Sequence, residues 1–97
     1  MSSVFAVIRT RGVTWKDGLP LEQQDEWEPH RVFMNALEAE GFVLLGGPLE
    51  QSRDVLLIFR ADSPEQIERR LAEDPWTRNG FLRTVQISPW QVRIGSL

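Results

Sequence analysis

The stretch VLLIFRADSPEQ, residues 55–66, passes from a strand to a helix within a few residues. Residues 55–61 are rich in apolar and β-branched side chains, a composition that favours a β-strand. Ser63 then supplies a helix N-cap, Pro64 suits the first helical position, and Gln66 completes a capping box. A strand that leads directly into a capped helix is the unit from which mixed α and β domains are built.

The same signals recur on both sides of this stretch. The expected elements are a strand at 4–11, a loop at 12–22, a helix that starts around Pro29 and stops at Gly41, strands at 42–49 and 55–61, a helix from Ser63 to Pro75, a loop at 76–80 and a strand at 81–94. The order β-α-β-β-α-β predicts an α+β, ferredoxin-like fold, with a four-stranded antiparallel sheet and both helices on one face.

Length and composition limit the class of protein. With 97 residues the chain is long enough for one domain, 1–97, and the 41% hydrophobic and 26% charged content is that of a globular protein. Cysteine is absent, which excludes disulfides, thiolate metal sites and a cysteine nucleophile. The net charge of −3 argues against a nucleic-acid binder. No apolar run approaches the ~20 residues that span a bilayer, and no leader is recognisable, so a cytoplasmic location is expected.

The expected strands are apolar on both faces. Along 55–59, Val55, Leu57 and Phe59 alternate with Leu56 and Ile58. Two helices cover only one face of such a sheet, and an exposed apolar face of that size is unusual in a monomer. We therefore expect a homodimer through the open sheet face, the two sheets packing face to face. The alternative is that the C-terminal tail or the loop 12–22 covers this face, although that loop is short for the task.

A lone histidine and a carboxylate are expected at one end of the domain. His30 lies at the start of the first helix and Asp74 at the end of the second, on the stripe of Ile67 and Leu71. Crossover directions bring both to the same pole. A carboxylate beside an imidazole fixes its tautomer and suits general acid or base catalysis. The competing interpretation is structural: His30 is a satisfied helix residue, and Asp74 only ends its helix.

Other candidate residues lie near the same pole. Arg9 and Arg83 alternate with apolar residues on neighbouring strands and could bind a substrate carboxylate, or else pair with acidic residues. Trp15 and Trp76 could line a pocket, or else belong to the core. With one histidine, no cysteine, and neither a Gly-x-Gly-x-x-Gly motif nor a P-loop, no metal and no cofactor is expected.

Several short motifs together resemble those of the YCII-related (YciI-like) family of the dimeric α/β-barrel superfamily. They are Glu-Pro-His at 28–30, Gly-Gly-Pro-Leu at 46–49, Asp-Pro-Trp at 74–76 and Ile-Ser-Pro-Trp at 87–90, and they cover nearly the whole chain. The resemblance implies a dimeric α/β barrel and an active-site pair of His30 and Asp74. The superfamily includes isomerases, dehydrochlorinases and oxygenases that act on small molecules.

These observations favour a cofactor-independent enzyme that acts on a small organic molecule, anionic or aromatic, by isomerisation or by a lyase- or dehydrochlorinase-like step. His30 would move a proton and Asp74 would orient it. A non-catalytic ligand-binding or accessory dimeric module is the alternative, and a structural dimer with a vestigial site is a third possibility.

Overall fold

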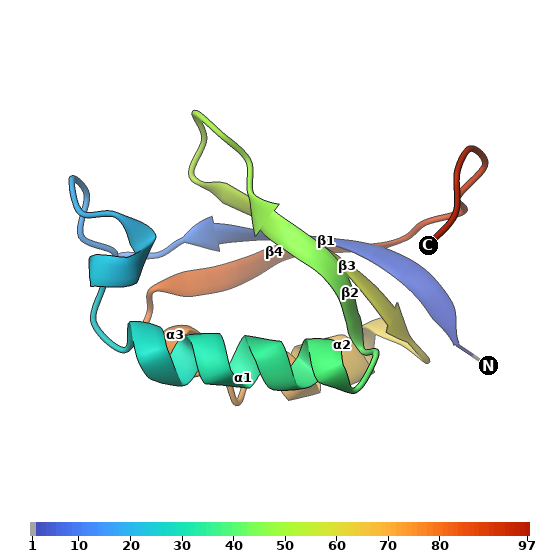
Figure 1. Ribbon diagram of the computed structural model, residues 1–97, viewed down its shortest axis with the longest axis horizontal. Helices are drawn as coiled ribbons and strands as arrows, with labels where there is room; N and C mark the ends of the chain where they lie inside the picture. Colours follow the sequence, from blue (N-terminus) through green and yellow to red (C-terminus); the bar gives the residue numbers. More distant parts are fainter. Residues whose placement is uncertain (1) are drawn as a thin grey trace.

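In the computed structural model, which describes residues 2–97, a four-stranded antiparallel sheet carries helices on one face only (Figure 1). The elements are β1 (Ser3–Arg11), the 3₁₀ helix η1 (Leu21–Gln23), α1 (Trp27–Ala39), β2 (Val43–Pro48), β3 (Asp54–Ala61), α2 (Pro64–Leu71), α3 (Pro75–Arg78) and β4 (Leu82–Pro89). The strand order β2-β3-β1-β4 confirms the predicted ferredoxin-like α+β fold. No helix among residues 2–97 is long and apolar enough to cross a membrane.

Ser63 caps α2 as predicted, because its hydroxyl accepts a hydrogen bond from the backbone N–H of Gln66. The Gln66 side chain accepts a hydrogen bond from the N–H of Asp62, one residue before the N-cap, and not from Ser63 as in a regular capping box. The buried side of α2 is formed by Ile67 and Leu71, which are at most 1% exposed.

The main core lies between the sheet and the two longer helices. It consists of Phe5, Val7, Leu37, Phe42, Val43, Leu57, Phe59, Ala61, Ile67 and Leu71. A second, aromatic cluster lies at the end of β1 and contains Trp15, Trp76, Phe81 and Leu82. The second cluster places indole rings where the sheet, α3 and the loop after β1 meet.

Two predicted boundaries near the C-terminus are wrong. The second long helix ends at Leu71 and not near Pro75, because residues 72–74 turn and Pro75 opens the separate helix α3 inside the predicted loop 76–80. Proline lacks the N–H that would continue a helix but fits a first helical turn. The last strand ends at Pro89 and not at 94, since proline cannot donate to the ladder.

Two other segments also depart from the expectation. Helix α1 begins at Trp27, so Pro29 is its third residue, still within the first turn where no intrahelical partner is needed. In β2 the pairing shifts at Leu44, so Val43 lies opposite Phe59 in the core whereas Leu45 reaches the other face. This bulge breaks the regular alternation of side chains along β2.

The helix-free face of the sheet is apolar along the middle of β1 and β3, whereas β4 contributes Gln86 and Ser88 beside Ile8 and Ala6. Ala6 and Leu45 both lie across from Ile58, and Ile8 lies across from Leu56. In Figure 1 the helices lie below the sheet and the upper face carries none. Neither the loop 12–22 nor the C-terminal tail buries Leu45, which is 51% exposed.

Candidate functional site

Three side chains from distant parts of the chain form a buried polar network. His30 Nδ1 lies 2.9 Å and 3.0 Å from the two carboxylate oxygens of Asp74. Arg9 Nη1 donates to Asp74 Oδ2 at 3.0 Å, and Arg9 Nη2 donates to the Thr77 hydroxyl. Arg9 and Asp74 are both 0% exposed and His30 is 8% exposed. The structure thus brings together the histidine and the carboxylate that the sequence placed at one pole.

Each member of the network is held by its secondary structure. His30 lies in the first turn of α1, where its N–H bonds the carbonyl of Glu26. Asp74 is the N-cap of α3, and its Oδ1 accepts a hydrogen bond from the N–H of Trp76 at 3.0 Å. It is therefore not on the stripe of α2, as its sequence position suggested. Asp is a preferred N-cap residue because its carboxylate satisfies a free backbone donor.

The charges of the network are balanced. Burial by itself raises the pKa of Asp74, but hydrogen bonds from His30, Trp76 and Arg9 outweigh it, so the pKa of this carboxyl lies below its ordinary value. Burial lowers the pKa of Arg9, and the bond with Asp74 opposes that shift. An arginine remains protonated in proteins. The Arg9 cation and the Asp74 carboxylate therefore neutralise each other beside the imidazole.

The imidazole of His30 is fixed in orientation and in tautomer. Its ring stacks on the Trp76 indole with a centroid distance of 3.9 Å and an interplanar angle of 11°. An ionised carboxylate can only accept, so Nδ1 carries the proton that is donated to Asp74. The lone pair of the neutral ring is then on Nε2, which has no hydrogen-bond partner among residues 2–97 and is not a buried atom.

His30 lines a cavity of about 280 Å³ whose walls are mostly apolar. The lining consists of Arg9, Arg11, Trp15, Leu21, Trp27, His30, Met34, Gly46, Gly47, Pro48, Val55, Leu57, Trp76 and Leu82. Trp15 meets Trp76 edge to face at 5.3 Å, and Trp27 lies 5.7 Å from it. Aromatic walls beside the His30 imidazole and the Arg11 guanidinium suit a small planar organic molecule.

The loop between β1 and α1 forms one wall of this cavity and is fastened at several points. The buried Gln24 side chain bonds the N–H and carbonyl of Lys16 and the carbonyl of Leu19. At the start of the loop, a Cβ on Gly12 would lie 2.2 Å from the carbonyl oxygen of Gly80, so only glycine permits this close approach. These contacts fix the loop, so that Trp15 packs with Trp76, Phe81 and Leu82 in the aromatic cluster.

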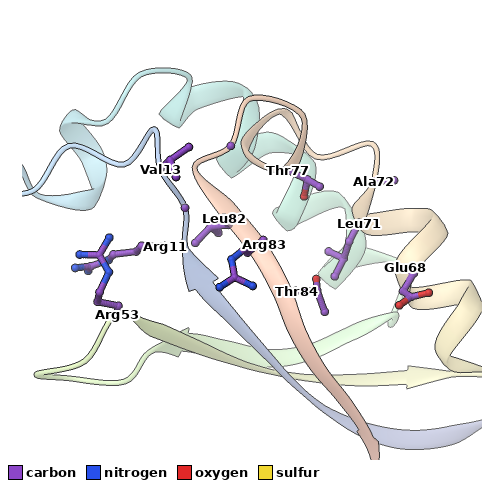
Figure 2. A pocket seen from close by; sticks show the side chains of 12 residues that line it. Arg11, Val13, Arg53, Glu68, Leu71, Ala72, Thr77, Leu82, Arg83 and Thr84 are labelled. Atoms are coloured by element: carbon purple, nitrogen blue, oxygen red, sulfur yellow. The ribbon is translucent and has the colours of Figure 1, made fainter.

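The structure separates the sequence-predicted binding residues into two groups. Trp15, Trp76 and Arg9 line the cavity with His30, although the Arg9 head group is occupied by Asp74 and Thr77 and its Nε is buried. Arg83 does not line that cavity. It lies in a more open hollow of about 550 Å³, with Arg11 and Arg53 at one end and Glu68 at the other (Figure 2).

Sequence reasoning missed two residues that shape the site: Thr77 holds Arg9, and Gln24 fastens the loop. Trp27 and Arg11, which the sequence places at the same pole, also line the cavity. Arg11 had a usable signal, because it alternates with Arg9 on β1 and so shares its face. Gln24 had none, since its partners are backbone atoms of a loop. Among residues 2–97 no group of three or more His, Asp or Glu side chains is arranged to hold a metal ion.

Comparison with known proteins identifies the family. The family model of the YCII-related domain matches residues 12–91. The chain belongs to the YCII-related family. None of the curated proteins compared with this YCII-related domain matches it.

A solved structure has the same fold: 5-chloro-2-hydroxyhydroquinone dehydrochlorinase (TftG) from Burkholderia phenoliruptrix AC1100, in complex with 2,5-dihydroxybenzoquinone. The TM-score is 0.66 at 21% sequence identity, and the match covers 91% of this YCII-related domain and 93% of that chain. A likeness at this identity establishes the fold, and function is argued from the site itself.

Proposed function

We propose that this YCII-related domain is a cofactor-independent enzyme for a small organic molecule, with His30 as the group that moves a proton. The observation that carries the proposal is the hydrogen bond from His30 Nδ1 to Asp74, which leaves Nε2 as the nitrogen available to the apolar cavity. A general base needs a lone pair aimed at the substrate and a partner that orients the ring. His30 and Asp74 supply both.

The proton transfer follows from the arrangement of His30 and Asp74. Nε2 takes a proton from a carbon or oxygen of the substrate, and Asp74 stabilises the imidazolium that forms. The electron pair left on the substrate either expels a leaving group, which is an elimination, or moves along the molecule. In the second case the imidazolium returns the proton to another atom, which is an isomerisation. Neither route requires an oxidant or a reductant, because the proton and the electron pair are both conserved.

The similar structure supports an elimination in particular. TftG is a dehydrochlorinase, and its structure was solved in complex with 2,5-dihydroxybenzoquinone, a small planar molecule. Loss of hydrogen chloride requires a proton acceptor beside the substrate, which is the role proposed for His30. The cavity of about 280 Å³ with tryptophan walls matches a single ring in size and character.

A binding module is the second candidate, and one observation favours it. The ionisable side chains that line the cavity are Arg9, Arg11 and His30, and an arginine remains protonated in proteins, so His30 is the one group among them that can both accept and donate a proton. A reaction that needs a separate acid and base would therefore lack one of them within residues 2–97. Such a site would hold its ligand without turnover.

One experiment separates these two functions. A panel of small planar compounds, chlorinated hydroquinones included, is tested for absorbance change and chloride release with the wild type, with His30→Gln and with Arg31→Gln as a matched control. Arg31 lies on the same helix, exposed and paired with Glu28. Loss of a general base is expected to lower turnover about 10²- to 10⁴-fold with ligand binding retained. Equal turnover in wild type and His30→Gln contradicts the proposal, and binding without turnover in either supports the module.

The functional unit is a homodimer that packs its open sheet faces together. The support is the apolar pair Ile8 and Leu56, which are half-buried and covered by no helix, and the exposure of Leu45 at the margin of this face; Ile58 between them is already buried within the chain. Light scattering at micromolar concentration is expected to give twice the chain mass. Leu45→Glu is expected to yield monomers, whereas Val32→Glu, at an equally exposed position of α1, is not. A compact wild-type monomer contradicts the assembly.

A further inference from the structure

One cation in the lining of the cavity beside His30, Arg11, has no acidic partner among residues 2–97, and it also borders the more open hollow that contains Arg83. We propose that Arg11 is the receptor for an acidic group, and that the ligand of this site is a small planar organic anion, a carboxylate or a phenolate. As a statement about the substrate, this rests on the proposed function. As a statement about binding, it stands on the charges and contacts around Arg11.

The charges of the cavity lining decide the sign of the ligand. Arg9, Arg11 and His30 are the ionisable residues of the lining, and no carboxylate side chain is among them. Arg9 is fully buried and its charge is offset by Asp74. Arg11 has no acidic partner among residues 2–97, whereas Arg31, Arg53 and Arg70 each pair with one. An apolar cavity with one unbalanced cation favours an anion, because a low dielectric strengthens that attraction.

The position of Arg11 relative to the imidazole defines how such an anion would lie. The Arg11 guanidinium carbon is 4.5 Å from the centre of the Trp15 ring, Trp15 contacts Trp76 edge to face, and Trp76 stacks on His30. Trp15 and Trp76, whose ring planes are at 82° to each other, thus connect the cation to the base through a chain of contacts. Arg11 and His30 both line the cavity, so a small anion bound there can present its acidic group to Arg11 and another atom to His30.

The contact with Trp15 leaves the donors of the guanidinium unused. Its carbon lies over the Trp15 ring, and none of its five N–H donors forms a hydrogen bond or an ion pair within residues 2–97. The edge of a guanidinium matches the two oxygens of a carboxylate in a bidentate pair. Stacking also removes rotamer freedom from Arg11 before the ligand arrives, so less ordering is left to be done on binding.

The test compares two probes of the same shape, benzoate and benzamide, which differ in charge. Their affinities for the wild-type protein are measured by tryptophan fluorescence and by calorimetry. A charge-assisted hydrogen bond predicts that benzoate binds about 10- to 100-fold more tightly than benzamide. In Arg11→Gln this preference is expected to vanish, with the affinity for benzamide changed little.

Arg83→Gln is the matched control. It also removes one positive charge, but Arg83 lies in the outer hollow and not in the lining of the His30 cavity (Figure 2). Benzoate affinity in this variant is expected to stay within about threefold of wild type, since a surface charge acts weakly through water. An equal loss in both variants would overturn the contact with Arg11, and so would equal wild-type affinities for benzoate and benzamide.

His30→Gln separates this inference from the proposed catalysis. Its preference for benzoate over benzamide is expected to be that of the wild type, because Arg11 is intact. If no compound is turned over but the preference depends on Arg11, the anion site stands and the enzyme proposal fails. If turnover depends on His30 while neutral and anionic probes bind alike, the enzyme proposal stands and the anion site fails.

Discussion

Replacing Arg9 with methionine tests whether the buried ion pair supports the fold as well as the imidazole. Methionine keeps much of the apolar stem but removes the donors to Asp74 and Thr77. Both partners of the pair are 0% exposed. Removing one partner of a fully buried pair costs about 3–5 kcal/mol, and the lower end is expected here because Asp74 keeps its hydrogen bonds from His30 and from the N–H of Trp76. Domains are stable by about 5–15 kcal/mol, so Arg9→Met is expected to lose a large share of its stability.

Urea unfolding followed by tryptophan fluorescence measures this loss. With a slope of about 1–3 kcal/mol per molar urea, the midpoint is expected to fall by about 1 M or more. Arg31→Met is the matched control, because it breaks an exposed i,i+3 pair with Glu28 that contributes less than about 1 kcal/mol. An Arg9→Met midpoint as close to wild type as that of Arg31→Met would refute the reasoning.

Two further variants keep the test decisive if Arg9→Met does not fold. Arg9→Lys retains the charge but not the two-point contact, and it is expected to be intermediate. Adding Asp74→Asn to Arg9→Met removes the orphaned charge, so the double variant is expected to be more stable than the sum of the single losses predicts. Strict additivity would mean that the two side chains do not interact in the folded protein.

Two other changes have defined outcomes. Because the pKa of Asp74 is lower in the folded protein, its stabilisation is present above the ordinary pKa of about 3.9 and is lost as the pH falls towards the folded value. Urea midpoints between pH 6 and pH 3 are expected to fall more steeply in wild type than in Asp74→Asn, and parallel curves would contradict this. Gly12→Ala puts a Cβ 2.2 Å from the Gly80 carbonyl oxygen and is expected to cost about 1–3 kcal/mol, whereas Gly47→Ala, with open space around it, is expected to cost less than about 0.5 kcal/mol by the same urea assay.

The element order could be predicted because its signals are local. The capping residues Ser63 and Gln66 and the apolar alternation of 55–59 each act within a few residues, and the structure contains the helix and the strand they indicate. The sequence predicted the correct pole for Asp74 but the wrong helix, because Asp74 caps α3 and is not part of α2. Helix α3 has four residues, too few for a hydrophobic period to appear.

The partners of charged side chains could not be predicted, because they are distant in sequence. Arg9 lies 65 positions from the carboxylate that it pairs with. Its pattern on β1 fits a substrate-binding arginine as well as a buried ion pair. The bulge at Leu44 is equally invisible, since it arises from how β2 meets β3 and not from a residue type.

Helix α3 and its N-cap supply three side chains of the polar network and its surroundings. Asp74 caps the turn, accepts from the imidazole and neutralises Arg9, while Trp76 and Thr77 of the same turn support the ring and the guanidinium. A glutamate at position 74 has a side chain one methylene too long to cap α3 in the same way, and an asparagine would leave Arg9 without its counter-charge. Trp15 and Leu21 of the β1–α1 loop form no hydrogen bond with this network, so exchanging them alters the cavity wall and leaves the hydrogen bonds among His30, Asp74 and Arg9 in place.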